Sequence, residues 1–410
     1  MNATSHAAAP SASRRRWGFA ITVVSLVGMM AGASAPSPFY PVLAAEIGFS
    51  SATITTVFAV YAITLLLTLL TAGSLSDHVG RRPVASVGLL LLAVSVLVFW
   101  HADSVAGLMW GRAVQGVASG LLLSSLSAAV TDLERPDRPG SAAVWNAVAP
   151  MVGLGGGALV SGIMLDVATE PMRDIFGPLS TAYAVLAVLV WFVPETAPRT
   201  PGALRSLRFQ LTVPAAMRAE FLRSAPAIFA GWATGGFFLS LGANIVAAEL
   251  GGRDHLWQGL SVALLAGTGG LAALLIRRRS AHTIVVFGTA ALASGTLLSL
   301  GALALNSLPL YLVTVSITGA GFGTAFFGVV RALSPHIPAT QRADVFAVIF
   351  LVSYLAFGVP TVVAGVLVQL FGLHPVSYGY GLLVALLAGT ACVLRLRYRR
   401  PNEDAPGLMA

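Results

Sequence analysis

The 410-residue chain has no lysine and little charge of either sign. Charged residues make up 10% of the sequence and hydrophobic residues 56%, whereas roughly a quarter of the residues in a soluble domain are charged. A water-soluble protein with this composition would expose large apolar patches. A bilayer about 30 Å thick instead takes about 20 apolar residues per helical crossing. The composition therefore predicts an integral membrane protein.

Residues that commonly build reaction centres are also scarce. The single cysteine, Cys392, can form no disulfide within the chain, so the redox compartment stays open. The sequence shows no H-E-x-x-H pattern, no zinc-ligand spacing and no phosphate-binding glycine loop. A pore-lining ring of charge, as a channel would need, is not visible either. We therefore expect no enzyme, no catalytic residue, no metal and no cofactor, and we do not expect transport driven by ATP.

Twelve apolar runs are each long enough to cross a bilayer. They predict an all-α membrane protein of twelve transmembrane helices arranged as two six-helix bundles. The runs cover residues 18–43, 52–72, 83–101, 105–129, 142–165, 176–193, 224–247, 257–276, 283–303, 309–332, 344–369 and 377–394.

The position of the arginines predicts the orientation. All 24 basic residues are arginine, and 21 of them fall at one set of span borders and in the segments beyond these. Only Arg173 and Arg253 fall on the other side, and Arg112 lies within a span. Because cytoplasmic loops are enriched in positive charge, both termini are expected in the cytoplasm. Arginines scattered over so many membrane borders do not form a nucleic-acid-binding stripe.

The start of the chain also resembles a secretory or twin-arginine signal. "SRRRWGF" is followed by an apolar run and by "AGASA". Cleavage there would leave eleven spans, and the run of about 26 residues is long for a signal core. We therefore interpret it as the first membrane helix.

Two short matches indicate an internal duplication. "VLAAEIG" at 42–48 pairs with "IVAAELG" at 245–251, and "APMVGLG" at 149–155 pairs with "VPTVVAG" at 359–365, at similar offsets. Equal numbers of spans in each half favour a parallel repeat about an axis along the membrane normal. The predicted division is a cytoplasmic tail 1–16, a bundle 17–193, a cytoplasmic linker 194–223, a bundle 224–395 and a cytoplasmic tail 396–410.

The segment "GSLSDHVGRRPV", residues 73–84, places polar residues between two apolar runs. A basic loop is what orientation alone requires, but this does not explain Gly73, Asp77 and Gly80. Gly73 would allow another helix to approach closely, and Gly80 would turn the chain into the next span. Asp77 at the membrane border could face the N-terminus of a neighbouring helix and hold it.

These residues resemble a signature of the major facilitator superfamily, G-x-L-x-D-x-x-G-R-R. "GRAVQGVASG", residues 111–120, resembles the superfamily pattern R-x-x-Q-G-x-x-x-G in the fourth helix, and "VPET", residues 193–196, is similar to the tail after the sixth. The resemblance implies two bundles that rock about a central site.

The resemblance also implies a conformational latch on the cytoplasmic side. Asp77 would lie against the start of the helix predicted at 344–369, and Arg81 would meet Asp132, both contacts closing the inner side. Asp344 would repel Asp77 unless a basic residue intervenes. The latch residues are Gly73, Asp77, Gly80, Arg81, Arg82 and Asp132.

The run 142–165 carries part of a further pattern. Drug and proton antiporters of the superfamily have a glycine-proline pair followed by paired glycines, and this chain has Ala149 before Pro150, with Gly153 and other glycines following. A kink at Pro150 and Gly153 is expected, either as part of an efflux mechanism or as simple packing.

The spans contain almost no ionisable side chains. All sixteen acidic residues fall at span borders or in loops, and Arg112 is the basic residue inside a span, which makes it a candidate for contact with substrate or a coupling ion. The structural alternative is an Arg112 side chain that reaches the outer headgroups or hydrogen-bonds to helix carbonyls. The prolines near residues 36–41 are expected to break the first helix. The candidate cavity residues are Phe39, Tyr40, Tyr61, Arg112, Gln115, Trp145, Asn146, Phe237, Asn244, Phe326 and Tyr354.

The sequence thus predicts a secondary transporter, in the inner (plasma) membrane of a bacterium, that moves a small amphiphilic molecule by alternating access. The preferred hypothesis is proton-linked efflux, and the alternative is metabolite uptake or uncoupled facilitation. The expected partners are a small-molecule substrate, protons if transport is coupled, and the lipid bilayer, with no nucleic acid, and the expected state is a monomer.

Overall fold

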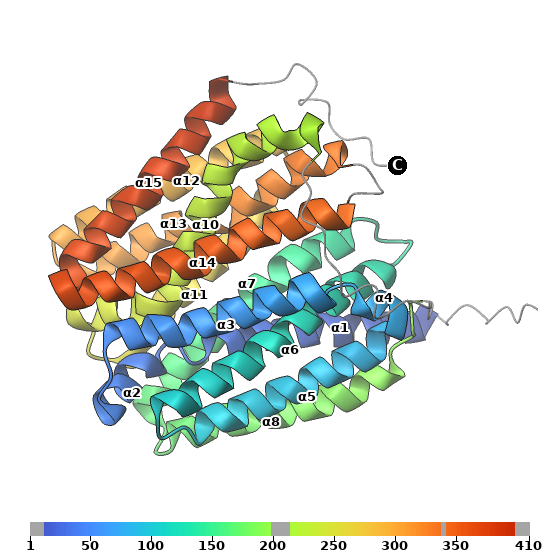
Figure 1. Cartoon of the computed structure of the whole chain (residues 1–410), viewed down its shortest axis with the longest axis horizontal. Helices are drawn as coiled ribbons and strands as arrows, with labels where there is room; N and C mark the ends of the chain where they lie inside the picture. Colours follow the sequence, from blue (N-terminus) through green and yellow to red (C-terminus); the bar gives the residue numbers. More distant parts are fainter. Residues whose placement is uncertain (1–11, 198–213, 338–341, 398–410) are drawn as a thin grey trace, which may run out of the picture.

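The computed structural model describes residues 12–197, 214–337 and 342–397, with only the backbone described at 215, 216, 336 and 342–344. Helices make up most of these ranges (Figure 1). The elements are α1 (Ala12–Ser34), α2 (Phe39–Ile47), α3 (Ser51–Ala72), α4 (Leu75–Val79), α5 (Arg81–Trp100), α6 (Val105–Asp132), α7 (Ser141–Val167), α8 (Pro171–Leu189), η1 (Val190–Phe192), α10 (Ala215–Ala248), α11 (His255–Ile276), α12 (Ala281–Ala304), α13 (Leu308–Leu333), η2 (Ser334–His336), α14 (Arg342–Phe371) and α15 (Leu373–Arg397).

Twelve helical segments within the described ranges are long and apolar enough to cross a membrane, which confirms the predicted spans. The first joins α1 and α2, and α10 begins at Ala215, inside the segment expected to be a linker. The early start of α10 has a packing reason. Met217 and Phe221 lie one turn apart and are buried in a cluster with Val285 and Val329 of the following helices.

The helices form two bundles, which confirms the predicted fold class. Figure 1 shows α1–α8 grouped in one bundle and α10–α15 in the other. Each bundle has its own apolar core, one around Leu26, Leu89 and Phe176 and the other around Leu241, Leu292 and Val315. A third cluster, which includes Phe58 and Phe357, joins the two bundles.

Corresponding contacts recur in the two halves. A Cβ atom on Gly116 of α6 would overlap Thr64 of α3, and one on Gly319 of α13 would overlap Thr268 of α11. Small residues at these points let helices approach closely where lipid offers no hydrophobic driving force between them.

A pair of tyrosines repeats in the same manner. Tyr183 of α8 donates to the carbonyl of Gly28 on α1 at 2.7 Å, and Tyr380 of α15 donates to that of Ala233 on α10 at 2.8 Å. In each half, an equivalent tyrosine hydrogen bond therefore joins the last span to the first span.

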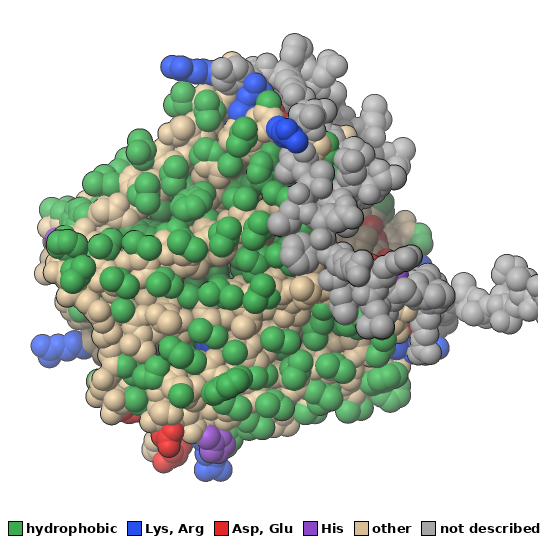
Figure 2. Space-filling view, in the orientation of Figure 1, with side chains coloured by type: hydrophobic (Ala, Val, Ile, Leu, Met, Phe, Trp, Pro, Cys, Tyr) green, Lys and Arg blue, Asp and Glu red, His purple; other side chains and the backbone are tan. Residues whose placement is uncertain are grey.

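The two ends of the bundles differ in charge, because most described arginines lie at one end and only Arg173 and Arg253 lie at the other. We call the end that holds the start of α1, the end of α6 and the end of α15 the basic end, and the other the opposite end. Figure 2 shows hydrophobic side chains spread over the middle of one face, with charged side chains at its margins. This distribution suits a protein whose middle lies in hydrocarbon.

Candidate functional site

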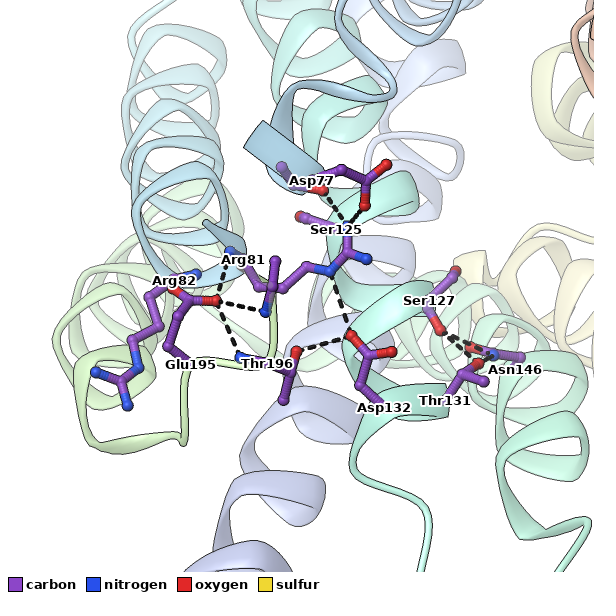
Figure 3. A network of polar contacts seen from close by, with 12 residues as sticks. Asp77, Arg81, Arg82, Ser125, Ser127, Thr131, Asp132, Asn146, Glu195 and Thr196 are labelled. Carbon is purple, nitrogen blue, oxygen red and sulfur yellow. Dashed lines mark hydrogen bonds and ion pairs between the residues drawn. The ribbon is translucent and has the colours of Figure 1, made fainter. Parts of the chain in front are cut away.

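A cluster of charged side chains lies at the basic end, within the first bundle. Arg81, the first residue of α5, forms an ion pair with Asp77 of α4 and donates to Ser76 Oγ at 2.7 Å. Its Nε lies 3.4 Å from Asp132 Oδ2 at the end of α6. Figure 3 shows the Arg81 side chain extending between these two carboxylates. One guanidinium thus joins the ends of three helices.

Glu195 completes this cluster from the segment after α8. Its two carboxylate oxygens accept hydrogen bonds from the backbone N–H groups of Arg81, at 2.8 Å, and Arg82, at 3.2 Å. These amides have no partner inside α5, and the helix dipole favours a negative charge there. Thr196 then donates its hydroxyl to Asp132 at 2.7 Å. Sequence reasoning noted "VPET" but gave Glu195 no role.

Gly80 is required on two grounds. Its φ of 113° lies where L side chains are strained, and a Cβ atom would lie 2.7 Å from Glu195 Oε2. The glycine therefore allows both the turn between α4 and α5 and the close approach of the capping carboxylate. The atoms nearest to a Cβ atom placed on Gly73 belong to Leu69 of α3, the helix that Gly73 ends. The close approach of another helix at Gly73 stays a prediction.

Arg15 of α1 also binds the end of α6, a contact that sequence reasoning missed. Its guanidinium donates to the carbonyl oxygens of Asp132 at 3.0 Å, Leu133 at 3.4 Å and Glu134 at 2.7 Å. A cation at a helix C-terminus satisfies orphan carbonyls and the dipole together. The end of α6 is therefore held from α1 and α5 at once.

The predicted contact of Asp77 with the start of α14 is not among the described interactions. The carboxylate of Asp77 is 54% exposed and faces Arg81. The side chains of Arg342 and Asp344 lie outside the described residues, so the expected repulsion by Asp344 falls there too.

A second polar centre surrounds the break between α1 and α2. Pro36 has no N–H to give to the carbonyl of Gly32, and the amide of Ser37 bonds to Ser34 instead of Ala33. Two carbonyls are thus left without helical donors. Gln115 donates to Gly32 at 2.8 Å, and Arg112 donates to Ala33 at 3.1 Å.

Arg112 is 1% exposed and is held on several sides. Its Nε donates to Tyr40 Oη at 2.8 Å and its Nη1 to Gln115 Oε1 at 2.6 Å. The guanidinium carbon lies 5.5–5.8 Å from the ring centroids of Tyr40, Tyr61 and Phe99, a cation–π geometry. Nη2 has no hydrogen-bond partner in the described part of the chain. The hydrogen bonds thus match the structural alternative, in which Arg112 binds helix carbonyls.

Aromatic side chains gather where the bundles meet. Trp232 of α10 lies 4.9 Å from Tyr354, 5.4 Å from Phe326 and 5.6 Å from Phe357, measured between ring centroids. Phe357 in turn lies 4.8 Å from Phe58 of α3, across the interface. The indole Nε1 of Trp232 is buried without a hydrogen-bond partner among the described residues.

Sequence reasoning named Phe326 and Tyr354 but missed Trp232, Phe357 and Phe58. A signal was present in "GWATGG", where glycines flank the tryptophan within an apolar run.

The other cavity candidates do not join one site. Phe39 packs on Phe176 in the core of the first bundle, and Phe237 stacks on Tyr380 in the second. Asn146 donates to the carbonyl of Ser127 at the basic end, 3.1 Å away. The remaining two are the half-exposed Trp145 and Asn244, whose side-chain oxygen is buried without a partner in the described ranges.

The predicted kink residues lie in a tightly packed stretch of α7. The helix continues through Pro150. A Cβ atom on Gly153 would overlap the carbonyl of Val27 on α1, and one on Gly157 would overlap that of Ala31. The glycines bring α7 against α1 just before the helix break.

Comparisons with known proteins agree with this architecture. The model of the family described as "Major Facilitator Superfamily" matches residues 22–361. The structure of the proton:xylose symporter XylE matches with a TM-score of 0.71 and 13% identity, covering 95% of this chain and 96% of that one, which shows a shared fold.

Two curated bacterial relatives match over part of their length. The multidrug resistance protein MdtL of Klebsiella pneumoniae is 28% identical over 39% of this chain and 41% of its own. The inner membrane transport protein YajR of Escherichia coli is 28% identical over 36% of this chain and 28% of its own. The matched region thus spans less than half of either relative.

Proposed function

Because the chain belongs to the major facilitator superfamily, we propose that this membrane transporter exports small amphiphilic molecules in exchange for protons. The bundles predicted at 17–193 and 224–395 would rock against each other about a site between them. The partial match to a multidrug resistance protein supports efflux. We further propose that the transporter works as a monomer in the inner membrane of a bacterium.

The aromatic cluster around Trp232 is the observation that carries this proposal. It lies at the contact between the bundles, where alternating access places the substrate. Aromatic rings offer large apolar contact, and the buried indole N–H offers one hydrogen-bond donor. Such a site fits a molecule with flat apolar surface and an acceptor atom.

The arginine distribution supports an orientation with the basic end in the cytoplasm. Both termini then face the cytoplasm, and the opposite end becomes the outer end. The cluster of Asp77, Arg81, Asp132 and Glu195 then lies at the inner rim, where it acts as the latch of the transport cycle.

Proton coupling would use carboxylates at the rims. Within the described residues, the acidic side chains lie near helix ends or in the connections between helices. Asp77 and Asp132 at the inner rim and Glu46 near the outer end of α2 are therefore the candidates for the coupling proton. Arg112 lies about 30 Å from Asp132 along α6, so it is too far away to pair with the acids of the inner rim.

The position of the acidic side chains also favours a second candidate function, uncoupled facilitation, because the described helix midpoints carry no carboxylate. Uptake of a metabolite by symport belongs to the same fold and stays an alternative.

The test uses purified protein in liposomes with ethidium as an aromatic amphiphilic probe. Accumulation against the ethidium gradient only when the lumen is acidic would support antiport. Equilibration that ignores the pH gradient would favour facilitation, and accumulation only with an alkaline lumen would favour symport. Equal flux in protein-free liposomes would overturn transport of this probe class.

A further inference from the structure

The two bundles are joined at the outer end by side chains that reach across the interface. Ser37 donates its hydroxyl to the carbonyl of Leu239, and Gln369 donates its amide to Ser50 Oγ. The third contact, at Asp166, is the one that involves a carboxylate. Asp166 lies in the last turn of α7, and the partners it has among the described residues belong to α11.

Asp166 occupies the N-terminus of a helix in the other bundle. Its Oδ1 accepts the backbone N–H of His255 at 2.8 Å and lies 2.8 Å from the same residue's Nδ1. Its Oδ2 accepts the backbone N–H of Leu256 at 2.7 Å. The first amides of α11 therefore obtain their acceptor from the opposite bundle.

Several other helices are capped by the residue that precedes them. Ser50, Ser104 and Ser280 each precede a helix and accept an amide from its first turn. Asp254 holds the equivalent position before α11, but its side chain makes no capping bond. A local acid is thus present and unused, while a distant acid does the capping.

The backbones of α7 and α11 touch directly below Asp166. A Cβ atom on Gly162 would lie 2.6 Å from the carbonyl of His255, and one on Gly259 would overlap the carbonyl of Ala158. The glycines bring the helices close enough for a short aspartate side chain to reach across. Separation of the bundles at this end would break all three hydrogen bonds together and leave helix amides to water.

We propose that Asp166 is a positioning residue that latches the outer end closed by capping α11 across the bundle interface. The inference rests on the proposed orientation and transport cycle. It gives the outer end a counterpart of the inner cluster around Arg81, in which Glu195 caps α5 within one bundle. Loss of the Asp166 charge is expected to favour the outside-open state.

The distance between spin labels at the outer end measures this state directly. Cysteines replacing the exposed Asp103 and Leu305, one on each bundle, carry the labels in a Cys392→Ser background. Asp166→Asn removes the charge at nearly constant size. The population with the open label distance is expected to rise about tenfold relative to the population with the closed distance, as for the loss of charge-assisted hydrogen bonds. An unchanged distance distribution in a folded protein would overturn the proposal.

The chain offers a matched control. Glu249 accepts from the same kind of partner, with His374 Nδ1 2.8 Å from its Oε2, but both residues belong to the second bundle. Glu249→Gln is expected to leave the distances unchanged. An equal shift in this variant would show a general effect of outer carboxylates and would contradict a specific latch.

A second variant covers the case in which Asp166→Asn does not fold. Leu256→Pro removes one of the capped amides and leaves Asp166 intact, at the second position of α11, where α13 of the same chain carries Pro309. A smaller shift toward the open distances is expected, and no shift would refute the latch. These measurements need neither substrate nor a pH gradient, so a failed efflux assay would disprove the proposed function without touching the latch.

Discussion

The side-chain amide of Gln115 donates to the carbonyl oxygen of Gly32 at 2.8 Å, in the place where a regular helix would use the backbone amide of residue 36. Residue 36 is a proline, so that amide hydrogen does not exist. Arg112, one turn earlier on α6, donates to the carbonyl oxygen of Ala33, which also lacks its helical donor. The motif of α6 thus supplies the hydrogen bonds that the broken first span lacks, which hydrocarbon surroundings could not provide.

Gln115→Leu should destabilise the protein by this reasoning. It leaves the carbonyl of Gly32 without a donor and removes an acceptor of Arg112, and a buried polar group without its partner costs about 1–3 kcal/mol. The thermal midpoint in detergent should fall clearly. Gln258 of α11 is also buried, but its side-chain oxygen has no partner in the described residues. Gln258→Leu should therefore lower the midpoint less, and the reverse order would refute the role of Gln115.

The membrane spans were predictable because whether a segment inserts into a membrane depends on its own length and apolar composition. Each apolar run had to be long enough to cross hydrocarbon, and its length alone located α3 at Ser51–Ala72 within one residue of the prediction. The start of α10 was not predictable in this way. Its first turns are polar enough to resemble a linker, and only burial of Met217 and Phe221 against other helices makes them part of the bundle.

The candidate site was predictable only in part, since spacing along the chain does not give partners across it. The residue pair Arg81 and Asp132 came from a motif resemblance. Arg15 and Asp166 belong to no motif, and the resemblance of "VPET" gives Glu195 no partner; each of the three binds backbone atoms of a distant helix end. Such contacts depend on how helices are arranged in space, and one sequence does not reveal this.

Gly80→Ala should be costly because of both conformation and space. At φ 113° and ψ 149° the backbone is almost reserved for glycine, and strain of this kind costs about 1–3 kcal/mol. The added Cβ would also press on Glu195. Gly140 is the control, since it has φ 84° with nothing within 4 Å of a Cβ atom. Thermal denaturation should show the larger loss for Gly80→Ala, and equal losses would mean that the Glu195 contact adds nothing.

Asp77→Asn should slow transport without lowering the stability of the folded protein. The carboxylate is about half exposed, and exposed ion pairs contribute only about 0.2–1 kcal/mol, so the transport rate should fall about two- to fivefold with little change in thermal midpoint. Asp137 pairs with Arg135 in an exposed connection of the same basic end. Asp137→Asn should change neither quantity. A normal ethidium flux in Asp77→Asn would exclude Asp77 from the latch.

Trp232→Phe should weaken substrate binding without slowing turnover. The replacement keeps an aromatic ring against Tyr354 and Phe326 but removes the buried indole N–H, which has no partner among the described residues. If that donor serves the substrate, KM for a probe with an acceptor atom should rise about tenfold, the equivalent of one hydrogen bond of about 1.4 kcal/mol.

The matched control for this variant is Trp191→Phe. Trp191 Nε1 donates to Ser86 Oγ at 3.1 Å, within the first bundle, and its ring is half exposed. Its replacement should leave KM unchanged. The flux of rhodamine 6G, whose ester carbonyl can accept a hydrogen bond from an indole N–H, and of tetraphenylphosphonium, which has no acceptor atom, should be measured with both variants, and Trp232→Phe should raise KM for the first probe only. If Trp232→Phe leaves KM unchanged for both probes, or if the control raises KM equally, the aromatic cluster is not the wall of the substrate site.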